Sequence, residues 1–181
     1  ASVRVSAGAG LTYIGVSNVY GEKEQAIWSL GSGKAITCMQ TTERAANLGD
    51  GTFMNYAKDS LPEMRLYSYT TSSNMGNGQT LHIGRNGNTQ LPVKNLDGRT
   101  VEYTVFDRRL SDAERCRVES YLALKYDVSL RSSYLNSRSE VIWNGYTNKA
   151  YSHRIAGIIS DKASALHKTR AKSCEEDGFL T

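Results

Sequence analysis

The chain of 181 residues carries 22 basic and 18 acidic residues, a formal net charge of +4, and 39% of its residues are hydrophobic. The charges are interspersed and form no basic stripe beside aromatic platforms, which argues against a nucleic-acid-binding protein. No apolar run approaches the ~20 residues needed to cross a bilayer, which argues against membrane insertion.

Short stretches of strand-like sequence fill the first hundred residues. The candidate strands are residues 3–5, 11–19, 26–30, 35–41, 52–56, 65–69, 80–85 and 100–106. The segments between them are rich in glycine, asparagine and aspartate, the residues that tolerate positive φ in tight turns. Short strands at this spacing predict an all-β fold, an antiparallel β-sandwich.

Residues 98–126 give the clearest signal in the sequence for a strand followed by a helix. Residues 101–106 alternate in polarity with period two, as a strand does. Ser111 is followed three residues later by Glu114, which is the spacing of a helix capping box. The sequence therefore predicts a strand that ends near Phe106 and a helix, residues 111–126, that begins at Ser111.

The predicted helix has a repeat of apolar residues at helical spacing. These residues are expected to lie on a core: Val118, Tyr121, Leu122 and Tyr126. Three charged residues, Arg115, Arg117 and Glu119, are expected to face solvent. The helix is predicted to close the sandwich. After residue 128 the pattern loosens, and residues 129–181 are expected to be a C-terminal β extension or the start of a following β module.

Residues 105–115, with the sequence Val-Phe-Asp-Arg-Arg-Leu-Ser-Asp-Ala-Glu-Arg, resemble a known structural junction. They are similar to the last strand and terminal helix of the laminin-G-like, concanavalin-A-like lectin sandwich of large bacterial surface proteins. Segments 11–16, 25–30, 81–84 and 96–99 resemble earlier strands and turns of the same sandwich. Segments between 121 and 166 resemble an uncharacterised segment that commonly follows such modules.

This resemblance implies a jelly-roll, concanavalin-A-like sandwich over residues 1–128 that lacks one or two upstream strands. It also implies an extracellular or cell-surface location as part of a longer chain. The expected partners are glycans, neighbouring domains or other surface proteins.

Catalytic motifs are missing from the sequence. Glycan-cleaving members of that superfamily resemble one another in a Glu-x-Asp-x-x-Glu strand motif, which this sequence lacks. Gly31 to Lys34 has the composition of a phosphate loop without its spacing, and no nucleophile elbow occurs. No catalytic residue is predicted, and the chain is not expected to be an enzyme.

Lectin-like sandwiches bind sugars through aromatic platforms beside amides, because a pyranose has an apolar face and a rim of hydroxyls. Neighbouring segments offer both kinds of side chain: Tyr67, Tyr69, Asn74, Asn77, Asn86 and Asn88. The alternative, which the sequence favours, is that the tyrosines are half-buried strand residues and the asparagines serve turns.

Calcium is the candidate cofactor, because related modules hold it with loop carboxylates. Asp97 and Asp161 are the candidate ligands, with hydrogen-bonding turn residues as the alternative. The sequence has three cysteines: Cys38, Cys116 and Cys174. They cannot all pair, and a single disulfide bridge is the most that they could form.

These patterns favour a non-catalytic lectin-like module of a secreted or cell-surface bacterial protein that serves adhesion, spacing or assembly. The alternative is a carbohydrate-binding module associated with a glycan-processing enzyme.

Overall fold

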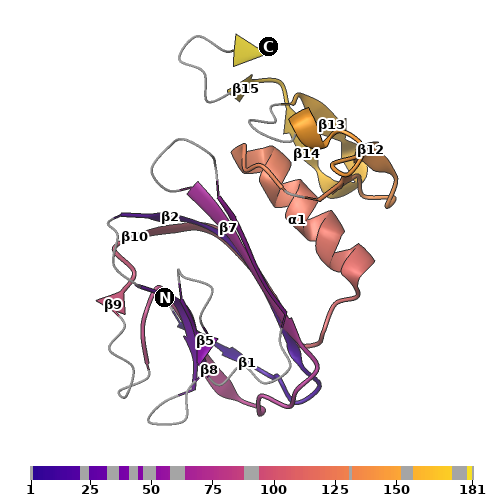
Figure 1. Ribbon diagram of the computed structural model, residues 1–181. Coiled ribbons are helices and arrows are strands. Elements are labelled where there is room, and N and C mark those ends of the chain that lie inside the picture. Colours follow the sequence, from indigo (N-terminus) through magenta and orange to yellow (C-terminus); the bar gives the residue numbers. More distant parts are fainter. Residues whose placement is uncertain are drawn as a thin grey trace. The chain divides into compact units, whose positions relative to one another are not determined.

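The structure is a computed structural model that describes residues 2–20, 25–31, 37–40, 45–46, 52–57, 64–87, 94–130, 132–151, 157–172 and 179–180 (Figure 1). The chain divides into two compact units. The first comprises Ala1–Asn55 and Tyr67–Leu110, and the second comprises Tyr56–Leu66 and Ser111–Thr181. This division falls before the helix, whereas the predicted domain boundary lay at residue 128.

The described residues are mostly β-strands with one α-helix, which confirms the all-β prediction at this coarse level. One sheet has the order β1 (Ser2–Val5), β8 (Gln79–Ile83), β3 (Gln25–Leu30), β4 (Thr37–Gln40) and β5 (Ala45–Ala46), with β9 (Lys94–Asn95) paired to β3. The other sheet has the order β10 (Gly98–Phe106), β2 (Leu11–Val19), β7 (Met64–Thr71) and β6 (Thr52–Ala57).

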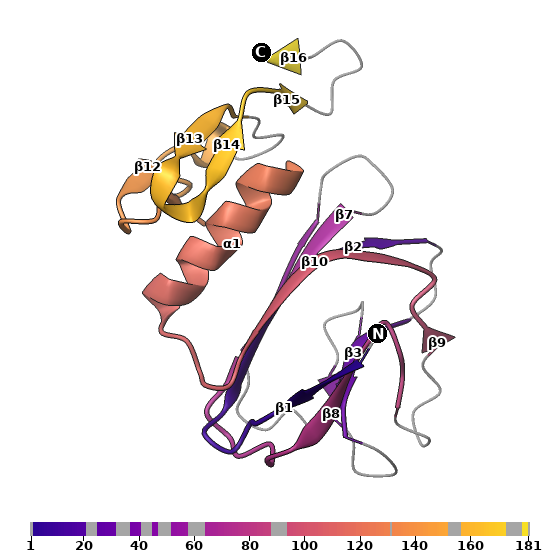
Figure 2. The ribbon, with the colours of Figure 1, turned by 180° about the vertical axis from the view of Figure 1, so that it is seen from behind.

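The order of the described strands places β1 and β10 at the edges of their sheets. β1 runs antiparallel to β8, and β10 runs antiparallel to β2. The pair of β3 with β9 is parallel. Among the described strands, β1 and β10 each have a partner on one side, and Figure 2 shows both from behind.

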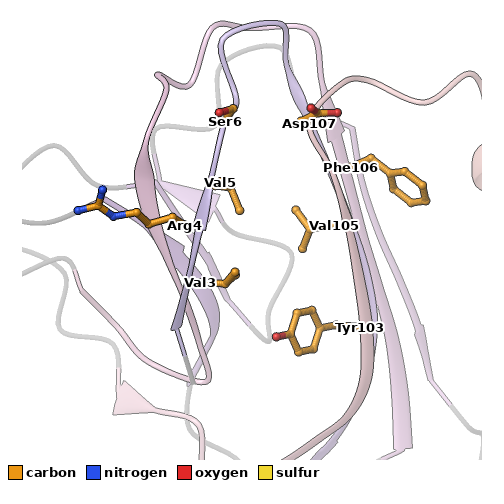
Figure 3. Close-up of a pocket in the computed structure, with 8 residues that line it drawn as sticks. All are labelled: Val3, Arg4, Val5, Ser6, Tyr103, Val105, Phe106 and Asp107. Carbon is orange, nitrogen blue, oxygen red and sulfur yellow. The ribbon is translucent and has the colours of Figure 1, made fainter.

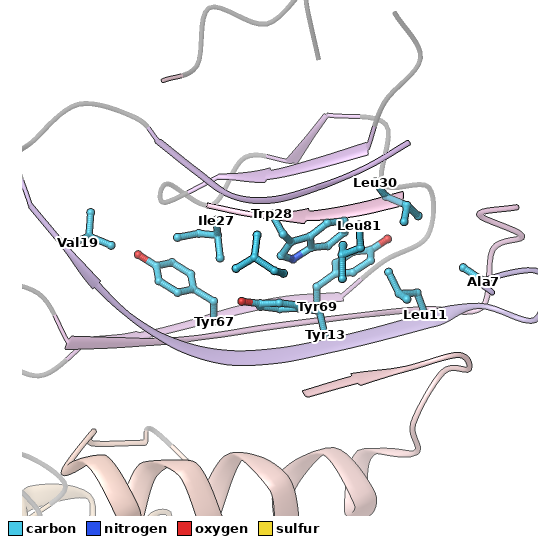
Figure 4. Close-up of a cluster of buried hydrophobic side chains, with 11 residues drawn as sticks. Ala7, Leu11, Tyr13, Val19, Ile27, Trp28, Leu30, Tyr67, Tyr69 and Leu81 are labelled. Atoms are coloured by element: carbon cyan, nitrogen blue, oxygen red, sulfur yellow. The ribbon is translucent and has the colours of Figure 1, made fainter. Parts of the chain in front are cut away.

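Side chains from both sheets share one hydrophobic core in the first unit (Figure 4). Its centre is aromatic: the ring centroid of Trp28 on β3 lies 5.7 Å from Tyr13 on β2 and 5.6 Å from Tyr69 on β7. All three side chains are fully buried. The core residues of β7, Tyr67 and Tyr69, and those of β8, Leu81 and Ile83, are two positions apart, as the period of a β-strand requires.

The helix α1 (Asp112–Tyr126) begins as the sequence predicts. The Ser111 hydroxyl accepts a hydrogen bond from the Glu114 amide at 3.3 Å, and the Glu114 carboxylate accepts one from the Ser111 amide at 2.9 Å. The capping box is therefore complete, and it satisfies two backbone donors at the start of the helix.

The predicted polarity of the helix faces was partly wrong. Arg115 and Glu119 are buried, with 7% and 0% exposure, together with Leu122 and Ala123. These four residues follow the spacing i, i+4, i+7 and i+8, so they form one helical stripe. Arg115 Nη1 donates to both Glu119 carboxylate oxygens, at 2.8 and 2.9 Å. Mutual neutralisation lets this pair occupy positions that hydrophobicity alone assigns to solvent.

The other residues of the predicted apolar face are only half-buried: Val118, Tyr121 and Tyr126. Arg117, also predicted to face solvent, is half-buried, and its Nη1 donates to the Ser137 carbonyl at 3.4 Å. Leu122 is the member of the predicted face that the structure places in a core.

Short hairpins complete the second unit. They are formed by β11 (Tyr134–Leu135) with β12 (Val141–Trp143), β13 (Ile159–Asp161) with β14 (Leu166–Lys168), and β15 (Ala171–Lys172) with β16 (Phe179–Leu180). Two 3-10 turns, η1 (Lys149–Tyr151) and η2 (Lys162–Ser164), lie between the strands.

The helix is tied to these hairpins. It contacts β11 and β14. The Leu135 amide donates to the Ser120 hydroxyl at 2.9 Å, and Lys168 Nζ donates to the Leu124 carbonyl at 2.7 Å. In the described part of the chain, no helix combines the length and apolarity required to span a membrane.

Candidate binding groove

A groove of about 530 Å³ opens between β1 and β10 in the first unit (Figure 3). Its lining comes from these two strands and the residues that follow them: Val3, Arg4, Val5, Ser6, Tyr103, Val105, Phe106 and Asp107. Because β1 and β10 are edge strands of different sheets, the groove lies where the space between the sheets opens to the surface.

The apolar walls of the groove continue the hydrophobic core. Val5 and Val105 pack against the core cluster, and Figure 3 shows them pointing toward one another. Val3 and Tyr103 extend the same walls and are 43% and 38% exposed. Val3 and Tyr103 lie two residues from Val5 and Val105, so they point to the same side of their strands. They are partly exposed because they lie at the edge of the core.

Tyr103 is held in place by a stack on Tyr13. The two rings are nearly parallel, with an interplanar angle of 11° and centroids 6.2 Å apart. Gly15 lies opposite Tyr103 in the strand register, and a Cβ atom at this glycine would lie 2.6 Å from the Tyr13 hydroxyl oxygen. The absence of a side chain at Gly15 therefore makes room for the stack.

Tyr13 is itself fully buried, and its hydroxyl has no hydrogen-bond partner among the described residues. Burial raises the pKa of Tyr13 far above its ordinary value, and the neighbouring Tyr103 and Tyr67 raise it further. The phenol consequently stays neutral at physiological pH.

Polar groups lie at one end of the groove. Figure 3 shows that Ser6 and Asp107 lie on opposite sides of this end, and that the side chains of Arg4 and Phe106 point away from the groove. Within the described part of the chain, the side chains of Ser6 and Asp107 make no hydrogen bond or ion pair. A carboxylate and a hydroxyl are thus available to a ligand beside the apolar walls.

The predicted ligand platform at Tyr67 and Tyr69 is corrected by the structure. Both tyrosines are 0% exposed and belong to the core cluster. A ring with both faces covered offers no surface for a sugar to stack on. They were candidates because tyrosine suits either role, and their burial depends on packing between strands remote in sequence.

The candidate asparagines that the structure describes take part in hydrogen bonds with other loop residues. The Asn74 side chain accepts from the Gly76 amide at 2.9 Å, and Asn77 accepts from the Gly8 amide at 3.0 Å. The Asn86 amide donates to the Asn95 side chain at 2.9 Å. The Asn74 bond fits the turn alternative, whereas the other two join residues 69 and 9 positions apart and do not test it. Asn88 lies outside the described residues.

The two candidate calcium ligands belong to different units. Asp97 is exposed, and its backbone amide donates to the Gln25 side chain at 2.6 Å. The Asp161 carboxylate accepts from the Ser137 amide and hydroxyl, both at 2.8 Å, and these bonds lower the pKa of Asp161. Within the described ranges no cluster of three or more histidine, cysteine or acidic residues could hold a metal ion. Calcium binding stays a prediction.

Cys116 is a free, half-buried thiol. Burial raises the pKa of Cys116, although the neighbouring Arg115 acts in the opposite direction. The side chain of Cys38 and the whole of Cys174 lie outside the described residues.

The fold and the groove together describe a β-rich protein with a surface suited to binding. Residues 114–181 match the family model of a domain of unknown function, DUF8202. The match begins inside α1 and covers the hairpins of the second unit, and it does not reach the groove. No curated protein and no solved structure matches the chain.

The groove was not predicted from the sequence. The alternation of residues 101–106 predicts a strand, but the edge position of β1 and β10 depends on pairing across the whole sheet and has no local signal. One signal for the groove was present in the sequence. Val3 and Val5 are apolar residues two positions apart, like Tyr103 and Val105 on β10.

Proposed function

We propose that the first unit is a concanavalin-A-like, laminin-G-like β-sandwich and that the chain is a non-catalytic module of a secreted or cell-surface bacterial protein. Its role is adhesion or assembly. The shared core of two antiparallel sheets supports the sandwich assignment, and the complete capping box supports the resemblance at residues 105–115.

The groove between β1 and β10 is the observation that carries this proposal. Its apolar walls and its free polar end are suited to holding a partner. Asp107 is the one carboxylate among the lining residues, whereas hydrolysis of a glycosidic bond ordinarily uses two. Binding without turnover is therefore the function that this site supports best.

A carbohydrate-binding module is the second candidate. Tyr103 favours it, because its ring is 38% exposed and is fixed from behind by Tyr13. A sugar could stack on the exposed face of this ring. Such a module would be associated with a glycan-processing enzyme.

A parallel screen of the intact chain tests both candidates. The chain is applied to a glycan array and to an array of extended peptides, and every bound glycan is then assayed for release of reducing ends. We expect binding that Tyr103→Ala weakens, without release of product. Product formation by the wild-type chain, absent from a mock purification, would refute the proposal. Binding to glycans alone would favour the second candidate.

A further inference from the structure

We infer that the groove between β1 and β10 is an acceptor site for an extended strand from a partner protein, which pairs with the free edge of β10. This inference rests on the proposed binding function and specifies its partner.

The first step concerns the backbone. β10 pairs with β2 along one side, and no described strand pairs with its other side. A free edge of this kind presents rows of amide and carbonyl groups that can hydrogen-bond to an added strand. β10 has nine residues, so it can pair with a partner segment about 30 Å long at roughly 3.3 Å per residue. Residues 103–106 lie beyond the bulge between Thr100 and Glu102 and keep a regular register with β2.

The second step concerns the side chains. An added strand alternates its side chains between two faces, so every second one enters the groove. There it meets Val3 and Val5 on one wall and Tyr103 and Val105 on the other. Val5 and Val105 already contact the core, so the new contact is continuous with the packed interface between the two sheets. Apolar side chains of the partner would cover the exposed parts of Val3 and Tyr103.

The aliphatic walls favour a polypeptide over a sugar. A pyranose placed between the valines would turn part of its hydroxyl rim toward groups that accept no hydrogen bond, and unpaired buried hydroxyls are costly. Backbone amides of an added strand instead meet the hydrogen-bonding edge of β10, while its apolar side chains meet the valines.

The third step concerns charge. Asp107 lies at the end of the groove where β10 finishes, and its carboxylate has no ion-pair partner among the described residues. A lysine or arginine of the partner at this end would complement it. If the partner runs antiparallel to β10, this residue lies near the start of the partner strand. If it runs parallel, the residue lies near its end.

The inference is tested with capped nine-residue peptides that alternate valine and threonine and carry one lysine at the first or the last position. Binding to the intact chain is measured by fluorescence anisotropy. We expect saturable binding of one lysine isomer, with at least tenfold weaker binding of a scrambled peptide of the same composition. Asp107→Asn should remove the difference between the two lysine isomers. Peptide binding should also slow hydrogen exchange of β10 amides in the wild-type chain.

A pair of matched variants localises the site. Val3→Lys should weaken peptide binding at least tenfold, because it places an ammonium group in an apolar wall. Val141→Lys is the control, because Val141 has a similar exposure, 56% against 43%, and belongs to the second unit. Circular dichroism establishes that both variants are folded, and the exchange measurement on the wild-type chain needs no variant.

Three results would overturn this inference. The first is the absence of both saturable peptide binding and slowed exchange in β10. The second is binding to glycans that Val3→Lys abolishes while peptides fail to bind, which leaves the carbohydrate-binding candidate standing. The third is self-association of the chain in sedimentation velocity that Val3→Lys abolishes, which assigns the groove to a second copy. Glycan turnover would instead refute the proposed function itself.

Discussion

Replacement of Glu119 by alanine is expected to destabilise the second unit strongly. Glu119 is 0% exposed and accepts two hydrogen bonds from Arg115, which is 7% exposed. Removal of the carboxylate leaves the guanidinium buried, with one remaining described carboxylate contact to Asp112 at 3.3 Å. Breaking a buried pair in this way costs about 3–5 kcal/mol. The cost comes from the charge left behind and only in small part from the lost attraction.

The double variant Arg115→Met with Glu119→Leu separates these contributions. Because it removes both charges and keeps the volume apolar, its stability should return to within about 1 kcal/mol of the wild type or exceed it. Urea unfolding, followed by far-UV circular dichroism, measures the stability of both variants. The midpoint and the slope of the unfolding free energy against urea concentration are both compared with the wild type, because two units can unfold in separate steps. A cost below 1 kcal/mol for Glu119→Ala, equal to that of Arg117→Ala, would refute the assignment of a buried pair.

Three further predictions follow from the contacts described above. Ser111→Ala should cost about 0.5–2 kcal/mol by releasing the Glu114 amide, and an unchanged urea midpoint would contradict the role of the cap. Gly15→Ala should cost about 1–3 kcal/mol, because its Cβ would collide with the Tyr13 hydroxyl; near-ultraviolet circular dichroism should show the lost aromatic stack, and an unaltered spectrum would argue against it. Asp161→Asn should destabilise the chain near neutral pH. Because folding lowers the pKa of Asp161 below its ordinary value of 3.8, the extra stability of the wild type over the variant should shrink as the pH falls through 3.8. It should vanish below the folded pKa, and a stability difference that is independent of pH would contradict this.

Local signals in the sequence were sufficient for the longer strands of the first unit and for the start of the helix, whereas the short strands β5 and β9 were not predicted. The prediction for residues 11–19 coincides with β2 (Leu11–Val19), and the prediction for 100–106 differs from β10 by two residues at its start. The capping box is equally local, since its two partners are three residues apart. Such features depend on neighbours in the chain, so a single sequence contains what is needed to find them.

Features that depend on remote residues were missed. The burial of Tyr67 and Tyr69 requires the opposite sheet, and the parallel pair of β3 with β9 joins segments about 70 residues apart. Arg115 and Glu119 were assigned to solvent because each is charged, and their burial follows from their pairing with one another. Charge at a helical position therefore predicts exposure only where no partner lies one turn away.

The contact between Lys168 and the last turn of α1 has a consequence for how the chain can be divided. The ammonium group donates to the Leu124 carbonyl and to the Asp127 carboxylate, 44 and 41 residues earlier, so a residue of β14 completes the end of the helix. Its positive charge also opposes the negative end of the helix dipole. A chain cut at residue 128 would leave the helix without this support, whereas a cut before Ser111 would preserve it. The helix therefore belongs with the C-terminal segment, and the division between the two units falls between Leu110 and Ser111.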